Sequence, residues 1–139
     1  MKQEKSCGCI IIKDGTVLVE NQYGDLPGEL FWNFPKGHQE AGENDFETAI
    51  RETKEEVGLD VIIANKDPII MKYLVKKGTV EKTVLLFLAK LNPEYEEKIT
   101  VQEEEVAEAK WVPFEEVEDL LSFERTKTAW REAKQKIGA

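Results

Sequence analysis

Residues 37–59, GHQEAGENDFETAIRETKEEVGL, decide the fold of this 139-residue chain. The stretch begins with a loop, Gly37 to Gly42, and continues as one predicted helix from about Asn44 to Val57. Asn44 is a favourable N-cap, and Gly58 suits the left-handed position that ends a helix. At about 100° per residue, five side chains share the stripe that we expect to pack inward: Phe46, Ala49, Ile50, Thr53 and Val57.

Three glutamates occupy a neighbouring face of the same predicted helix. Glu52, Glu55 and Glu56 are spaced i, i+3 and i+4, so their carboxylates lie close together. Two unit charges about 4 Å apart repel by about 4 kcal/mol at an effective dielectric near 20. We expect Arg51 and Lys54 on the far side of the helix, which leaves Mg²⁺ or Mn²⁺, held by oxygen ligands, to relieve the repulsion. The alternative is a solvated acidic face.

The spacing of the whole stretch resembles the Nudix box, G-x5-E-x7-R-E-U-x-E-E-x-G-U, where U is apolar. The chain has Gly37, then Glu43, then RETKEEVGL over residues 51–59. Thr53, at the first apolar place, is the one departure, and its methyl group can still face the core. A match over the whole box is far more specific than a glycine loop alone. The resemblance implies a hydrolase whose fold belongs to the α/β class, a Nudix-type α/β/α sandwich around a mixed β-sheet.

The Nudix resemblance also implies a ligand set for the metal. Glu52, Glu55, Glu56 and the carbonyl of Gly37 match the family's ligands, and Glu52 is also a candidate general base. Arg51 and Glu43 match residues that hold the glutamates without binding the metal. For Arg51 the alternative is an ordinary surface ion pair.

A further acidic residue is expected from across the fold. Glu105, six residues before Trp111, is our choice for the distant ligand or base, and Glu103 and Glu104 are its rivals. The predicted catalytic residues are therefore Glu52, Glu56, Glu105 and Arg51.

The surrounding residues resemble one branch of the family. Residues 34–38, FPKGH, and 51–53, RET, are similar to the asymmetrical bis(5′-nucleosyl)-tetraphosphatases, which split diadenosine tetraphosphate to ATP and AMP. Lys36, His38 and Lys82 would then contact the polyphosphate, and Tyr73 could stack on a base. The alternatives are a turn role for His38 and a core position for Tyr73.

Two other functions stay open at this point. One is a Nudix pyrophosphohydrolase acting on (oxidised) nucleoside triphosphates or ADP-ribose. The other is a Nudix module that binds a nucleotide without hydrolysing it. Retention of all three box glutamates favours an enzyme.

Composition limits the remaining possibilities. The length predicts one domain over residues 1–139. A net charge of −9 argues against nucleic-acid binding and requires local positive charge to meet a polyanionic nucleotide. No stretch reaches the length of a membrane span and no signal peptide is evident, so we expect a cytoplasmic protein. For its oligomeric state we expect a monomer or homodimer. Cys7 and Cys9 are expected to be buried thiols on one strand face.

The other elements follow from alternation, turn residues and caps. Strands are predicted at 6–12, 16–21, 30–34, 60–64, 69–75, 80–91 and 105–112, with hairpin turns at Asp14-Gly15 and 76–79. Helices are predicted at 114–121 and from a cap at Ser122 to about Lys136. Mixed strands and helices without a regular βαβ alternation favour a mixed sheet with helices on both faces.

Overall fold

A computed structural model describes all residues from Met1 to Ala139. The helices are α1 (Asp45–Val57), α2 (Phe114–Leu120) and α3 (Glu124–Ile137). The strands are β1 (Lys2–Lys13), β2 (Thr16–Tyr23), β3 (Leu30–Asn33), β4 (Lys36–His38), β5 (Val61–Ile63), β6 (Ile69–Val75), β7 (Val80–Leu91) and β8 (Val106–Pro113). No helix is long and apolar enough to cross a membrane.

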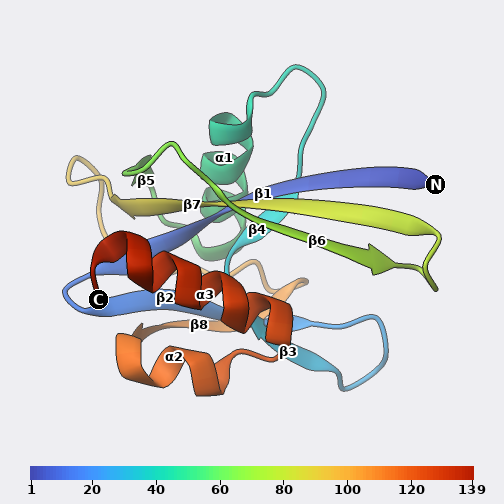
Figure 1. The fold of residues 1–139 in the computed structure, drawn as a ribbon. Coiled ribbons are helices and arrows are strands. Elements are labelled where there is room, and N and C mark those ends of the chain that lie inside the picture. Colours follow the sequence, from blue (N-terminus) through green and yellow to red (C-terminus); the bar gives the residue numbers. More distant parts are fainter.

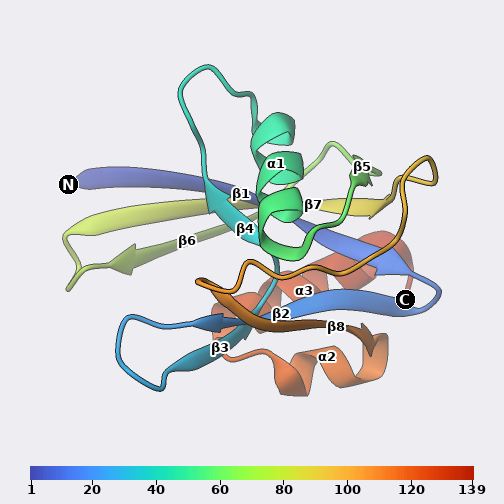
Figure 2. The ribbon, with the colours of Figure 1, turned by 180° about the vertical axis from the view of Figure 1, so that it is seen from behind.

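Strand β1 lies at the centre of a mixed sheet ordered β3-β2-β1-β7-β5. It pairs in parallel with β7 and antiparallel with β2 and β4, while β6 pairs with β7 and β8 with β2. Figure 1 views the sheet from the side of α3, and Figure 2 views it from the side of α1. Helices therefore cover both faces, which confirms the predicted α/β/α sandwich.

Alternating side chains of β1 pack into two separate hydrophobic cores, one on each face of the sheet. Cys7, Cys9 and Ile11 pack under α1, whereas Ile10 joins the core around Trp130 of α3. Because successive strand side chains point to opposite faces, one strand can anchor both layers. The two thiols are free and buried as predicted, and burial raises the pKa of Cys7 to about 11 and of Cys9 to about 12.

Helix α1 begins and ends as its sequence predicts. The Asn44 side chain accepts a hydrogen bond from the Glu47 N–H at 2.8 Å, and Gly58 ends the helix with φ 76°. The predicted inward stripe is wrong at Ile50, which is 37% exposed, while Glu56 is only 3% exposed. The buried face is centred on Ala49, Thr53 and Glu56, so Ile50 falls on its border.

Two further local predictions are wrong, because the residues concerned form hydrogen bonds with distant strands. The start of the predicted 37–42 loop is strand, because β4 pairs with β1. Ser122 does not cap α3; its hydroxyl accepts a hydrogen bond from the Trp32 N–H at 2.7 Å, and Phe123 occupies the N-cap position. The hairpin turn at Asp14-Gly15 is confirmed, with both residues at positive φ.

Candidate active site

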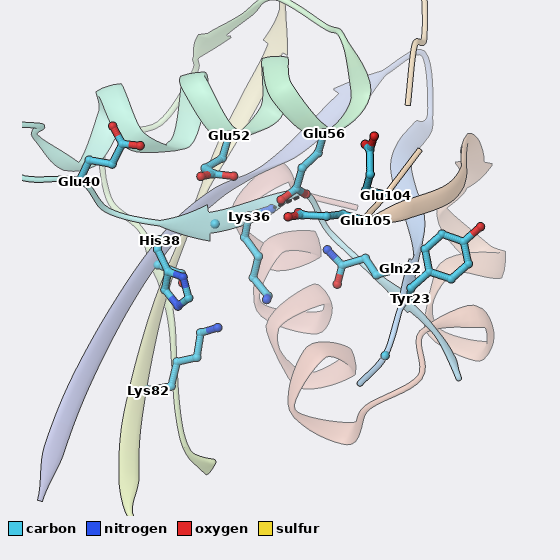
Figure 3. A pocket seen from close by; sticks show the side chains of 13 residues that line it. Gln22, Tyr23, Lys36, His38, Glu40, Glu52, Glu56, Lys82, Glu104 and Glu105 are labelled. Atoms are coloured by element: carbon cyan, nitrogen blue, oxygen red, sulfur yellow. Dashed lines mark hydrogen bonds between the residues drawn. The ribbon is translucent and has the colours of Figure 1, made fainter. Parts of the chain in front are cut away.

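A cavity of about 480 Å³ opens where α1, β1, β2 and β4 meet the segment before β8. Its wall is divided by charge on either side of β4 (Figure 3). Acidic side chains line one side: Glu40, Glu52, Glu56, Glu104 and Glu105. Basic side chains line the other: Lys36, His38 and Lys82.

Close packing brings Glu52 against the backbone of β4. A Cβ atom at Gly37 would overlap the Glu52 carboxyl group, so only glycine allows this approach. Glu56, one turn further along α1, accepts a hydrogen bond from the Lys36 N–H at 3.3 Å. Both carboxyl groups thus lie beside the strand that carries Gly37, as the sequence predicted.

Glu20 of β2 is a buried acidic residue that the sequence analysis missed. It is 0% exposed, lies beside Glu56, and accepts a hydrogen bond from the Gln22 side chain. Burial raises the pKa of Glu20 and of Glu56, and the negative charge of Glu20 raises that of Glu56 further. One Glu20 oxygen, Oε1, has no hydrogen-bond partner. The available signal was a carboxylate at the end of the apolar run VLV, two residues after the inward-facing Leu18.

Arg51 does not lie on the far side of α1 from the glutamates, as we had expected. Its guanidinium donates to both carboxylate oxygens of Glu43, at 2.6 and 3.0 Å, and to Glu52 at 2.8 Å. It also donates to Glu55 at 3.1 Å and to the His38 carbonyl at 2.9 Å. These bonds raise the pKa of Arg51 and lower that of Glu43 to about 2. Arg51 shares a helix face with Glu55, four residues further on, whereas Lys54 does point away and pairs with Asp60.

The structure separates the predicted metal ligands into two groups. Glu52, Glu56 and Glu105 line the cavity, but Glu55 is 48% exposed in its side chain and pairs with Arg51 outside it. Of the rivals to Glu105, Glu104 lines the cavity and Glu103 does not. No three acidic, histidine or cysteine side chains converge on one point.

The chemistry of this donor set fits a divalent cation of the magnesium type. Carboxyl oxygens and the backbone oxygen of Gly37, all from residues that line the cavity, are hard ligands. Glu52, Glu56 and Glu105 line the same wall without converging on one point, and they are the side chains that could hold the ion. When bound, such an ion neutralises phosphate charge and makes a water molecule more acidic.

The basic side of the cavity is held by neighbouring strands. Burial lowers the pKa of both Lys36 and Lys82. The charge of Glu56 acts in the opposite direction on the pKa of Lys36, whereas the charge of Lys36 lowers the pKa of Lys82 further. His38 lies 3.4 Å from Glu4. Tyr73 does not line the cavity; it is the strand partner of Lys82, and the Arg125 guanidinium lies 3.8 Å from its ring centre.

Comparison with known proteins identifies the family. The model of the NUDIX domain matches residues 2–135. The chain belongs to the Nudix hydrolase family. The sequence is 32% identical over 141 residues to a rat protein named bis(5′-nucleosyl)-tetraphosphatase [asymmetrical], covering 94% of this chain and 93% of the relative. A mouse protein of the same name is 36% identical over 144 residues, with the same coverage.

Solved structures agree with the sequence relatives. A crystal structure described as a binary complex of a C. elegans Ap4A hydrolase superposes with a TM-score of 0.80 at 26% identity, covering 97% of this chain and 98% of the other. The predicted family and fold of this Nudix hydrolase are therefore confirmed. Nudix hydrolases generally need a divalent metal ion, which agrees with the oxygen-rich wall of the cavity.

Proposed function

We propose that this Nudix hydrolase cleaves dinucleoside polyphosphates, with diadenosine tetraphosphate giving ATP and AMP, in the presence of Mg²⁺ or Mn²⁺. The observation that carries the proposal is the division of one cavity into an acidic and a basic side. A chain with net charge −9 meets a polyanion only through local positive charge, and Lys36 and Lys82 provide it beside the acidic wall. The names of the rat and mouse relatives point to the same substrate class.

In this proposal the acidic side carries the chemistry. Glu52, Glu56, Glu105 and the Gly37 carbonyl would hold the metal ion, and Glu55 would be a further ligand if its carboxylate were released from Arg51. Glu52 or Glu105 accepts the proton of the attacking water. Arg51, fixed by its two bonds to Glu43, positions Glu52.

The basic side binds the rest of the substrate. Lys36, Lys82 and His38 contact phosphates beyond the bond that is cleaved, and binding energy from those phosphates aligns the reacting one. Tyr73 offers a ring on which a base can stack. Because Arg125 covers one ring face at 3.8 Å, the base uses the other face or displaces the guanidinium. We also propose that the enzyme is a cytoplasmic monomer or homodimer and does not act on nucleic acid.

A substrate panel tests the reaction. Dinucleoside polyphosphates, nucleoside triphosphates and ADP-ribose are incubated with the enzyme and Mg²⁺, and the products are separated by anion exchange. We expect ATP and AMP from diadenosine tetraphosphate at a much higher kcat/KM than for the other compounds. Preferential release of pyrophosphate from triphosphates would replace this proposal with that of a triphosphate pyrophosphohydrolase.

Neighbouring glutamates provide a matched set of variants for the distant residue. Glu105→Gln should lower kcat by about 100-fold or more, because a charge that holds the metal or accepts a proton is lost. Glu103→Gln, outside the cavity, serves as the control and should be close to wild type. A large loss in Glu104→Gln with little loss in Glu105→Gln would transfer the role to Glu104.

A further inference from the structure

Ser6 of β1 presents an unexplained polar group on the basic side of the cavity. The residue is 0% exposed and lines the cavity, yet its hydroxyl has no hydrogen-bond partner. Buried hydroxyl groups nearly always have a partner, because an unpaired one keeps the cost of losing water. The acidic side chains lie on the other side of β4 from His38 (Figure 3), and Ser6 is the strand partner of His38, so the metal-binding wall does not account for Ser6.

Strand register places Ser6 between the two cavity lysines. Ser6 is the direct partner of His38 on β4 and of Val84 on β7. One step along β1 on the same face, Gly8 pairs with Lys36. One step in the opposite direction, Glu4 pairs with Lys82. Directly paired residues and residues two apart share a face, so Ser6 lies on the line from Lys36 to Lys82.

The groups around Ser6 indicate an anionic partner. Lysine ammonium groups only donate hydrogen bonds, so they attract an acceptor into the space between them. The acceptor on this face, Glu4, is already engaged with Lys76 at 3.2 Å and lies 3.4 Å from His38. An oxyanion held by both lysines would pass over Ser6, whose hydroxyl hydrogen is free to bond with it.

We propose that the Ser6 hydroxyl donates a hydrogen bond to a phosphate oxygen of the substrate, between the phosphates that Lys36 and Lys82 contact. Because Ser6 is 0% exposed, the side chains around it must move for the hydroxyl to reach the phosphate. Ser6 thereby selects for a polyphosphate chain long enough to reach both lysines. This inference rests on the proposed function, because it uses the same cavity and the same class of substrate.

Binding measurements on a single variant test the role of Ser6. Ser6→Ala and the wild type are titrated by calorimetry, in Mg²⁺, with a methylene-bridged diadenosine tetraphosphate and, separately, with AMP. We expect the Kd for the tetraphosphate analogue to rise about tenfold, as for the loss of one hydrogen bond to a charged group, and the Kd for AMP to stay within about twofold. The melting temperature of Ser6→Ala should be equal to or above that of the wild type, since the variant loses an unpaired buried group.

A second orphan hydroxyl provides the control. Thr126 is 1% exposed and its hydroxyl also lacks a partner, but it does not line the cavity. Thr126→Val should leave both Kd values unchanged. Equal binding of the tetraphosphate analogue by Ser6→Ala and wild type would overturn the inference, and so would a clear fall in melting temperature, which would give the hydroxyl a structural role.

The two proposals fail in different ways. If the wild type hydrolyses diadenosine tetraphosphate and Ser6→Ala binds its analogue normally, only the role of Ser6 is lost. If the wild type neither binds nor hydrolyses dinucleoside polyphosphates, the proposed function is lost, and inorganic tripolyphosphate becomes the probe. A tenfold weaker Kd in Ser6→Ala would then keep Ser6 as a phosphate contact, and an unchanged Kd would remove it.

Discussion

Replacing Arg51 by methionine is the sharpest test of how the acidic wall is held together. Arg51 donates two hydrogen bonds to Glu43 and one each to Glu52 and the His38 carbonyl, and it also contacts Glu55. Methionine keeps most of the stem and removes every donor. The variant therefore leaves the carboxylates of Glu43, Glu52 and Glu55 without their shared cation.

The expected loss of stability follows from the exposure of the partners. A charge-assisted bond contributes about 1.5–3 kcal/mol, but pairs that reach solvent contribute much less. The Glu55 side chain is 48% exposed and adds little, while Glu52 is 13% exposed and Arg51 itself is 23% exposed. We therefore expect Arg51→Met to lower the free energy of unfolding by about 2 kcal/mol, after a discount for solvent screening. Arg51→Lys should lower the free energy of unfolding by about half as much, because lysine keeps the charge but lacks the planar guanidinium with its paired N–H donors.

Urea denaturation at pH 7, with EDTA present, measures this difference. Arg131→Met is a matched control, since Arg131 forms a comparable pair of ion contacts with Glu118 and Glu124 on an exposed surface. It should have a much smaller effect. Added Mg²⁺ should recover part of the loss in Arg51→Met, since a second cation can then screen the glutamates. An Arg51→Met protein as stable as the wild type in EDTA would refute the account of Arg51 as the element that holds the acidic wall.

Three more predictions concern individual side chains of the cavity and its support. Glu56→Gln should lower kcat by about 100-fold or more, because a carboxylate ligand is lost, and leave the melting temperature equal or higher, because burial and Glu20 already disfavour the ionised form of this carboxyl group; near-normal turnover would exclude Glu56 from the ligand set. Lys36→Ala should raise KM for diadenosine tetraphosphate more than for a substrate with fewer phosphates, and equal increases would exclude a polyphosphate contact. The pKa of Glu43 is about 2 in the folded chain, below its unfolded value of about 4.3, so its stabilising effect is complete above that unfolded value and is lost as the pH falls toward 2. Glu43→Gln should flatten the stability profile between about pH 5 and pH 2 in urea titrations, and an unchanged profile would contradict the assignment.

Local patterns in the sequence were sufficient to predict the position of most helices, strands and turns. The Asp14-Gly15 hairpin and the capped ends of α1 depend on residues adjacent in the chain, and each is found where it was predicted. The strands at 69–75 and 80–91 also match, because alternation and turn residues define their limits. The prediction that Ser122 caps α3 was wrong for the opposite reason, because its hydroxyl accepts a hydrogen bond from the Trp32 N–H of the distant strand β3.

Long-range pairing and side-chain length account for what the sequence did not reveal about the site. Glu20 of β2 lies beside Glu56 of α1 only in the folded chain, and the residues next to Glu20 in the sequence do not predict that neighbour. The expected far-side position of Arg51 was wrong, because Arg51 and Glu55 are spaced i, i+4 and therefore share a helix face, from which the long guanidinium also reaches Glu52. Periodicity alone likewise placed Ile50 inward, whereas the buried face of α1 is centred on Ala49, Thr53 and Glu56 and leaves Ile50 at its border.

The three residues of β4 explain why the cavity is divided by charge. Because β4 is paired with β1 and is not a loop, its side chains must alternate. Gly37, opposite Cys7, faces α1 and leaves room for the Glu52 carboxyl, while Lys36 and His38 face the side of Ser6 and Lys82. A one-residue slip of this pairing would exchange the two sets and place a lysine stem where Glu52 now lies. The register of a very short strand therefore keeps the metal-binding oxygens and the phosphate-binding cations apart, yet close enough to act on one substrate.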